Sequence, residues 1–239
     1  MVRWSAAAQA AERRNTMKEF LSGFAERFRS AKNLKRRLAV LISGVVLMGL
    51  AVAVLDRIGW GADMYSTFNL GISRRIGISF GTWQMILNAV MLIFVLWRSP
   101  RLIGVGTLAN MFLVGYSADF FSFLMDALGL HPEVLQTAGK IAVFIPAIAL
   151  FLVAAAFYMV VDLGTAPYDS MPLLIHGAFK KPSFMVTRMI WDVSFILLGL
   201  LVGADVGVVT VAIAFGLGPV IRAVADRFRP LIIPGDGEN

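Results

Sequence analysis

Long apolar runs alternate with short polar or charged breaks along most of the chain. A run of about 18 to 22 residues without a charge is long enough, as an α-helix, to cross a hydrocarbon core of about 30 Å. The breaks consist of charged residues, glycine and proline. This pattern predicts six membrane-spanning helices at residues 38–57, 79–97, 102–124, 140–161, 184–203 and 206–222.

The sequence also repeats itself at an offset of 103 residues. One ungapped register pairs glycine, tyrosine and threonine positions as well as apolar ones: Gly61 with Gly164, Tyr65 with Tyr168, Gly104 with Gly207, Thr107 with Thr210 and Gly115 with Gly218. Such a register indicates an internal duplication. Each copy holds three spans, which is an odd number, so the second copy enters the membrane from the opposite side. The expected fold is an all-α membrane protein of two inverted three-helix repeats.

Each copy carries a break after its first span, in the segments GADMYSTF at 61–68 and GTAPYDSM at 164–171. Gly61 and Gly164 permit an abrupt turn, and Pro167 removes a backbone donor. We expect a short helix or re-entrant segment that faces the interior, because interrupted backbone at membrane depth needs cover from protein or a wet cavity. The alternative is a plain interfacial loop in which Asp169 caps the following helix.

A shorter amphipathic pattern precedes the first span. Met17, Phe20, Leu21, Phe24 and Phe28 recur at spacings of three and four, with basic and acidic residues between them. This predicts a helix lying on the headgroups of the membrane surface.

Composition and charge agree with a membrane protein. Hydrophobic residues make up 58% of the chain and charged residues 15%, which is unlike a soluble domain of this length. The net charge is +7, and the basic residues gather at the ends of apolar runs and in the N-terminal tail, a placement typical of binding to lipid headgroups rather than to nucleic acid. Most of them fall on one face, which we therefore assign to the cytoplasm with both termini: Lys32, Lys35, Arg36, Arg37, Arg98, Arg101, Lys180, Lys181, Arg222, Arg227 and Arg229. Arg57, Arg74 and Arg75 fall on the opposite face.

These assignments divide the chain into five parts. They are a cytoplasmic tail with the amphipathic helix at 1–37, a first repeat at 38–126, an extracytoplasmic linker at 127–139, a second repeat at 140–226 and a cytoplasmic tail at 227–239. No small-residue cleavage site follows the first apolar run, so a cleaved signal peptide is not expected.

Polar residues inside the spans are the candidates for a solute pathway. Arg188 and Asp192 are four residues apart and share a helix face, so we expect them to neutralise each other and to face the bundle interior. Snorkelling of Arg188 to the membrane surface is the alternative. The complete set of pathway candidates is Asp63, Tyr65, Asn88, Asn110, Asp119, Tyr168, Asp169, Arg188 and Asp192, and Gln84, Tyr116, Thr187 and Thr210 are further inward candidates.

Motifs for catalysis and cofactor binding do not occur in the sequence. Cysteine is absent, and His131 and His176 have no neighbours at metal-ligand spacing. No HExxH, Walker, GxSxG or paired-carboxylate motif is present. We therefore expect no enzyme activity, no metal and no cofactor.

Several of these motifs together resemble the bacterial YczE/YyaS/YitT-like membrane proteins. They are GTAPYD at 164–169, GISFGTW at 77–83, GVGT at 104–107 with GVVT at 207–210, and RMIWD at 188–192, and the resemblance covers about residues 38–226. It implies a multi-pass protein of the bacterial inner membrane. In that family the first copy commonly also reads proline, aromatic, aspartate; here Met64, Tyr65 and Ser66 stand there, and Asp63 is the residue that could substitute for the aspartate.

Two functions fit this sequence. The first is a small secondary transporter or channel for a small polar solute or ion, bound between the inverted repeats. The second is a non-transporting membrane partner, such as the substrate-binding subunit of a larger importer or a helper of a membrane complex. Besides the lipid bilayer and the solute, a homodimer is an open alternative, and no nucleic-acid partner is expected.

Overall fold

The structure is a computed structural model, and it describes residues 33–179 and 181–232. Within these ranges every regular element is a helix. The α-helices are α2 (Leu34–Ile58), α3 (Met64–Ile76), α4 (Phe80–Arg98), α5 (Val105–Ala127), α6 (Thr137–Val160), α7 (Pro167–Phe179), α8 (Phe184–Leu201) and α9 (Val208–Ile232), with 3₁₀ turns η1 (Pro100–Leu102) and η2 (Pro132–Val134). The amphipathic helix expected at 17–28 lies outside the described residues.

The long helices follow the predicted spans in order and, within a few residues, in position. Among the described residues, helices α2, α4, α5, α6 and α8 are long and apolar enough to cross a membrane. The sixth expected span corresponds to α9, whose role as a span stays a prediction. Two helices extend beyond the predicted spans: α2 already begins at Leu34, and α9 continues to Ile232, past residue 222 and into the expected tail at 227–239. Arginine and lysine are good helix formers, so a helix does not end where its apolar run ends.

In the structure the two breaks are the links at residues 59–63 and 161–166, and each is followed by a short helix. Helices α3 and α7 have 13 residues each and begin at Met64 and Pro167, which are 103 positions apart in the chain. Gly61 and Gly164 adopt φ angles of 90° and 113°, a region that favours glycine. Asp63 ends the first break as the N-cap of α3, where its carboxylate accepts a hydrogen bond of 3.1 Å from the Ser66 amide.

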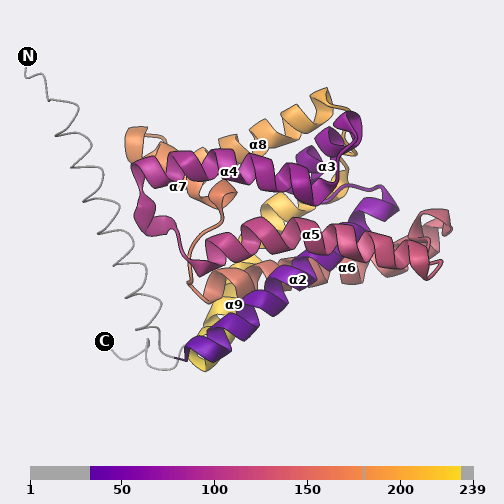
Figure 1. Cartoon of the computed structure of the whole chain (residues 1–239), viewed down its shortest axis with the longest axis horizontal. Coiled ribbons are helices and arrows are strands. Elements are labelled where there is room, and N and C mark those ends of the chain that lie inside the picture. The colour runs from indigo at the N-terminus through magenta and orange to yellow at the C-terminus, as the bar shows by residue number, and fades with distance from the viewer. Residues whose placement is uncertain (1–32, 180, 233–239) are drawn as a thin grey trace, which may run out of the picture.

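The helices form two layers in Figure 1. One layer holds α3, α4, α7 and α8, and the other holds α2, α5, α6 and α9. Helix α2 packs against α5 and α6, and α6 packs against α9. Each short helix lies against a long helix of the other half of the chain, α3 against α8 and α7 against α4. This crosswise packing brings the beginnings of α3 and α7 together in the middle of the molecule.

Two close backbone contacts hold the breaks in place. A Cβ atom on Gly104, at the start of α5, would overlap the carbonyl oxygen of Leu163 in the second break. A Cβ atom on Gly207, before α9, would overlap the carbonyl oxygen of Trp60 in the first break. At the first of these crossings the Gly106 amide also donates a hydrogen bond of 2.7 Å to the Leu163 oxygen. The repeated glycines therefore lie at two crossings. Gly164 of the second break meets Gly104 at the start of α5, and Gly61 of the first break meets Gly207 before α9.

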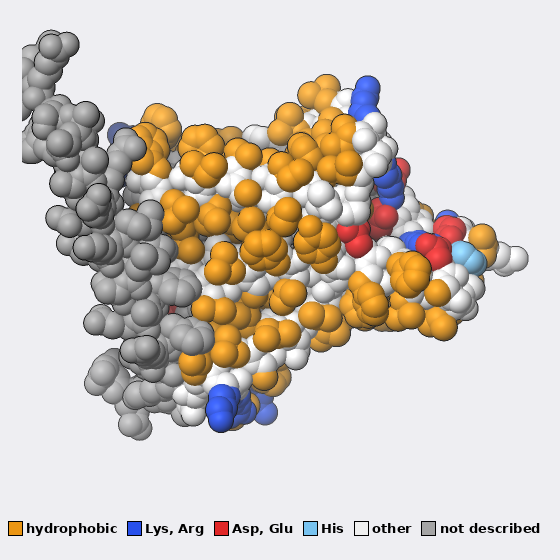
Figure 2. Space-filling view, viewed as in Figure 1, with side chains coloured by type: hydrophobic (Ala, Val, Ile, Leu, Met, Phe, Trp, Pro, Cys, Tyr) orange, Lys and Arg blue, Asp and Glu red, His pale blue; other side chains and the backbone are white. Residues whose placement is uncertain are grey.

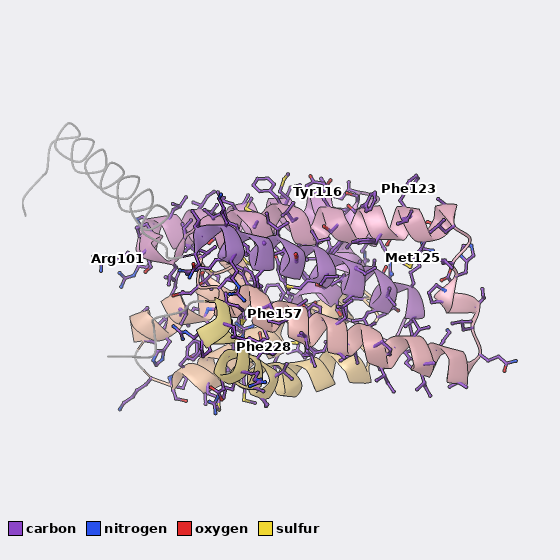
Figure 3. The ribbon with its side chains drawn as sticks, turned by 90° about the horizontal axis from the view of Figure 1, so that it is seen from below. Arg101, Tyr116, Phe123, Met125, Phe157 and Phe228 are labelled. Carbon is purple, nitrogen blue, oxygen red and sulfur yellow. The ribbon has the colours of Figure 1, made fainter. Side chains whose placement is uncertain are left out.

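The outer surface has the distribution expected of a membrane protein. Apolar side chains cover the broad face in Figure 2, and the coloured Lys, Arg, Asp and Glu side chains gather at its ends. Figure 3 shows Tyr116 and Phe123 on the outer side of α5, whereas Phe157 and Phe228 face each other between α6 and α9, with ring centroids 5.3 Å apart. The apolar band between two charged ends fits a bilayer that surrounds the bundle.

Two of the three arginines that break the predicted charge bias, Arg57 and Arg74, are paired with acidic residues. Arg57 contacts Asp126 at 2.6 Å. Arg74 contacts Asp205 at 2.7 Å and also Asp56. These pairs offset the positive charge of both side chains locally.

A candidate solute site between the two halves

The centre of the molecule is a contact between equivalent tyrosines. The rings of Tyr65, in the first turn of α3, and Tyr168, in the first turn of α7, are stacked with centroids 4.4 Å apart. Phe195 of α8 packs edge-on against both rings, at 5.7 Å from Tyr65 and 5.0 Å from Tyr168. Such edge-to-face and offset contacts add stability beyond the burial of area. The two halves of the chain therefore meet through their interrupted segments.

In the second half, four polar side chains form a connected cluster. The Tyr168 hydroxyl donates a hydrogen bond of 2.6 Å to one carboxylate oxygen of Asp192. The Arg188 guanidinium donates to the other oxygen of Asp192 at 3.0 Å and to Asp169 at 2.8 Å. Arg188 also lies over the Tyr168 ring, 5.4 Å from its centroid. The predicted contact between Arg188 and Asp192 is present, and the Arg188 guanidinium bonds to carboxylates of the protein.

In the first half, neutral residues stand in the corresponding places. The Tyr65 hydroxyl donates a hydrogen bond of 2.9 Å to the side-chain oxygen of Asn88. Helix α4 begins at Phe80, so the 103-residue offset predicts that α8 begins at residue 183. Helix α8 begins one residue later, at Phe184. Asn88 therefore corresponds to Asp192 in space, although the sequence offset alone pairs Asp192 with Ala89.

The same one-residue shift places Gln84 of α4 in the position of Arg188 of α8. In the short helices, where the 103-residue offset still holds, Ser66 corresponds to Asp169. Both of these first-half residues are buried. One half of the centre thus carries an arginine and two aspartates, and the other half carries a glutamine, a serine and an asparagine.

Beside these clusters lies a cavity with an empty volume of about 630 Å³, which includes space open to the outside. Its walls come from both halves and are lined by Met48, Asp63, Met64, Tyr65, Ser66, Gln84, Asn110, Val114, Phe151, Ala155, Tyr158, Met159, Ala166, Tyr168, Asp169, Arg188 and Ile213. Binding sites for small molecules commonly have mostly apolar walls and a few placed polar groups. The cavity has this character.

Two polar atoms at the cavity have no hydrogen-bond partner within the protein. They are the second carboxylate oxygen of Asp63, Oδ2, and the side-chain oxygen of Gln84, Oε1. The Gln84 side chain is buried, with 2% of its surface exposed. A buried acceptor without a donor costs free energy, so such groups call for a water or a ligand.

The structure separates the predicted pathway residues into three groups. Those that line the cavity are Asp63, Tyr65, Asn110, Tyr168, Asp169 and Arg188. Asn88 and Asp192 lie directly behind the two tyrosines and hold their hydroxyl groups. Asp119 lies apart from the cavity, because its carboxylate accepts a hydrogen bond of 2.9 Å from the Gly81 amide in the first turn of α4.

The expectation that Tyr116 faces inward is wrong. Its side chain is 42% exposed and lies on the outer side of α5, as Figure 3 shows. Its hydroxyl lies 3.6 Å from the Met85 sulfur. A tyrosine is apolar over most of its length, so it can face lipid with little penalty when its hydroxyl finds a local partner.

Two polar residues of the cavity, Ser66 and Tyr158, were not among the residues predicted from the sequence. Tyr158 of α6 lines the cavity, and its hydroxyl donates a hydrogen bond of 3.3 Å to the backbone oxygen of Gly164. The available signal was a tyrosine within the apolar run that leads into the second break. Among the described residues, no three His, Asp or Glu side chains gather in a way that could hold a metal ion.

Comparisons with known proteins agree with the resemblance noted in the sequence. The model of the family of unknown function DUF6198 matches residues 35–226. An uncharacterized membrane protein of Bacillus subtilis, YczE, is 26% identical over 145 residues, which cover 60% of this chain and 65% of YczE.

Two further relatives match more of the chain. The uncharacterized protein YyaS of the same organism is 21% identical over 170 residues, or 70% of this chain and 81% of YyaS. An uncharacterized protein of Haemophilus influenzae is 26% identical over 189 residues, covering 78% of this chain and 82% of that protein. No solved structure matches the chain significantly.

Proposed function

The chain belongs to the family of unknown function DUF6198, and we propose that it is a small secondary transporter or channel for a small polar solute. The cavity between the halves is the observation that carries this proposal. Asp63 and Asp169 line it at the beginnings of the short helices α3 and α7, and Arg188 lines it from α8. Charged groups inside a membrane bundle are costly and mark solute or ion pathways, and secondary transporters bind their substrates at such interrupted helices.

The proposal includes an inverted arrangement of the two halves. It is supported by the equal lengths of α3 and α7, by their crosswise packing on α8 and α4, and by the stacking of Tyr65 on Tyr168. With three spans in each half, equivalent residues of the halves would lie on opposite sides of the bacterial inner membrane. Both termini would then lie in the cytoplasm.

Cysteine labelling tests this topology directly, because the natural chain contains no cysteine. Ile76 and Phe179 end the two short helices, occupy equivalent positions and are exposed. We expect a membrane-impermeant maleimide added to intact cells to label Ile76→Cys, and to label Phe179→Cys only after the membrane is permeabilised. Labelling of both variants from the same side would contradict the inverted arrangement.

Transport is tested with purified protein in proteoliposomes. The probes are radiolabelled guanidinium, methylammonium, urea, acetate and alanine, and we expect protein-dependent uptake of at least one of them. Ala155 is buried and lines the cavity on α6. The change Ala155→Phe fills the cavity and is expected to reduce uptake to that of empty liposomes, because the pathway is blocked.

Ile145→Phe is the matched control, since Ile145 lies on the same helix and is exposed on its outer side. We expect this variant to retain uptake, and both variants to elute as the parent does in size-exclusion chromatography. Equal uptake by the Ala155→Phe protein would overturn the proposed pathway. Binding of a probe without uptake, together with a co-purifying ATPase, would instead support a substrate-binding subunit.

A further inference from the structure

We infer that the cavity takes a small cation that donates hydrogen bonds, such as an ammonium or a guanidinium ion. This inference rests on the proposed function only for the statement that the cation is transported, since binding in the cavity can be measured without flux. Three features of the described residues point to it. They are the sign of the charge at the cavity, the kind of polar atoms left without hydrogen-bond partners, and the ion pairs that Arg188 already makes.

The charge at the cavity is negative. Asp63 and Asp169 line it, and Asp192 lies directly behind Tyr168. Arg188 is the one Lys, Arg or His side chain among the described residues that line it. The N-termini of α3 and α7 each contribute about +0.5 of an elementary charge. Three carboxylates therefore outweigh one guanidinium and two helix ends, and a cation is attracted.

The unpartnered polar atoms of the cavity are hydrogen-bond acceptors. Gln84 Oε1 is buried, and Asp63 Oδ2 belongs to a carboxylate whose other oxygen already caps α3. A carboxylate oxygen accepts hydrogen bonds and donates none when ionised. N–H donors on a solute match acceptors of this kind and a positive charge is attracted to the Asp63 carboxylate, whereas a bare carbonyl or carboxylate solute offers no donor.

Arg188 does not provide a free anion site. Its guanidinium is already bonded to Asp169 at 2.8 Å and to Asp192 at 3.0 Å. An anion in the cavity would have to compete with these two carboxylates and would also face Asp63. The repulsion between like charges in a partly desolvated space disfavours that arrangement.

A binding experiment with shape-matched probes tests the sign of the charge. Purified parent protein is assayed by scintillation proximity with radiolabelled guanidinium and radiolabelled methylammonium. Urea has nearly the shape of guanidinium without its charge, and acetate carries the opposite charge. We expect the two cations to bind and to compete with each other, and urea and acetate to compete at least about tenfold more weakly.

Two variants test the position of the site. Asp63→Asn removes the charge but retains an excellent helix N-cap, and Gln84→Met removes the acceptor at similar size. We expect each to weaken binding of the cations about tenfold or more, with thermal unfolding close to that of the parent. Asp226→Asn, which changes an exposed carboxylate on α9, is the control and is expected to bind as the parent does.

The possible outcomes separate this inference from transport. Cation binding lost in both site variants but kept in the control supports the inference, whether or not proteoliposomes show flux. Binding or uptake of acetate or urea in preference to the cations overturns the inference and leaves the transport proposal intact. Cation binding that is unchanged in folded Asp63→Asn and Gln84→Met proteins overturns the site.

Discussion

The change Arg188→Gln is expected to destabilise the protein by about 3 to 5 kcal/mol. Arg188 makes ion pairs with Asp169 and Asp192, and both carboxylates are largely buried, with Asp192 only 8% exposed. Without the guanidinium, two carboxylates remain in a poorly hydrated space and repel each other. The measurement is thermal unfolding of the purified protein in detergent, together with the yield of folded protein.

The first half of the chain supplies the matched control for this prediction. It holds Gln84, Ser66 and Asn88 where the second half holds Arg188, Asp169 and Asp192. The triple variant Arg188→Gln, Asp169→Ser, Asp192→Asn copies this neutral set. We expect it to recover most of the stability lost by Arg188→Gln, because no buried carboxylate is then left without its partner. A melting temperature of the single variant equal to that of the parent would contradict the buried ion-pair account.

Alanine at either glycine of the backbone crossings is expected to cost about 3 kcal/mol. The new Cβ of Gly104→Ala would overlap the carbonyl oxygen of Leu163, and that of Gly207→Ala the carbonyl oxygen of Trp60. Both obstacles are backbone atoms, so a side-chain rotation cannot relieve the overlap. The break must move away from the helix start, which also weakens the hydrogen bond from Gly106 to Leu163. Thermal unfolding again measures the effect.

Gly177→Ala is the control for these glycine variants. Gly177 lies inside α7, and a Cβ atom there would meet no atom within 4 Å. Alanine in a helix is favoured over glycine by about 0.5 to 1 kcal/mol, so we expect an unchanged or slightly raised melting temperature. If Gly104→Ala and Gly207→Ala unfold at the same temperature as Gly177→Ala, the close crossings do not hold the breaks.

Much of the architecture could be predicted from the sequence. Apolar runs of membrane length predict helices because a helix satisfies its own backbone in lipid, so each span depends on its local sequence. The breaks were predictable because Gly61 and Gly164 recur in a shared register and tolerate a φ angle that other residues avoid. The spacing of Arg188 and Asp192 determined their contact, since residues four apart share a helix face. Each of these features is encoded in a short stretch of the sequence.

The site itself was decided by contacts between distant segments. Nothing near Tyr65 in the sequence indicates that its ring stacks on Tyr168, because that contact depends on how α3 and α7 pack across the halves. Because α8 begins one residue later than the offset predicts, Asn88 of the first half is the equivalent of Asp192 in the second half. The sequence offset alone could not reveal this. Asp119 and Tyr116 are polar residues of an apolar helix, as Asn110 is, yet only Asn110 lines the cavity.

The apolar runs, the repeat and the glycines therefore determined by themselves that this is a helical membrane protein with two interrupted segments, because hydrophobic length and backbone freedom are properties of short stretches. Which polar groups share one cavity, and that Asp63 and Gln84 keep unpartnered acceptors there, was decided only by the tertiary structure. The physical reason is that a hydrogen bond or a charge interaction depends on the distance between side chains, and packing of helices far apart in the chain sets that distance.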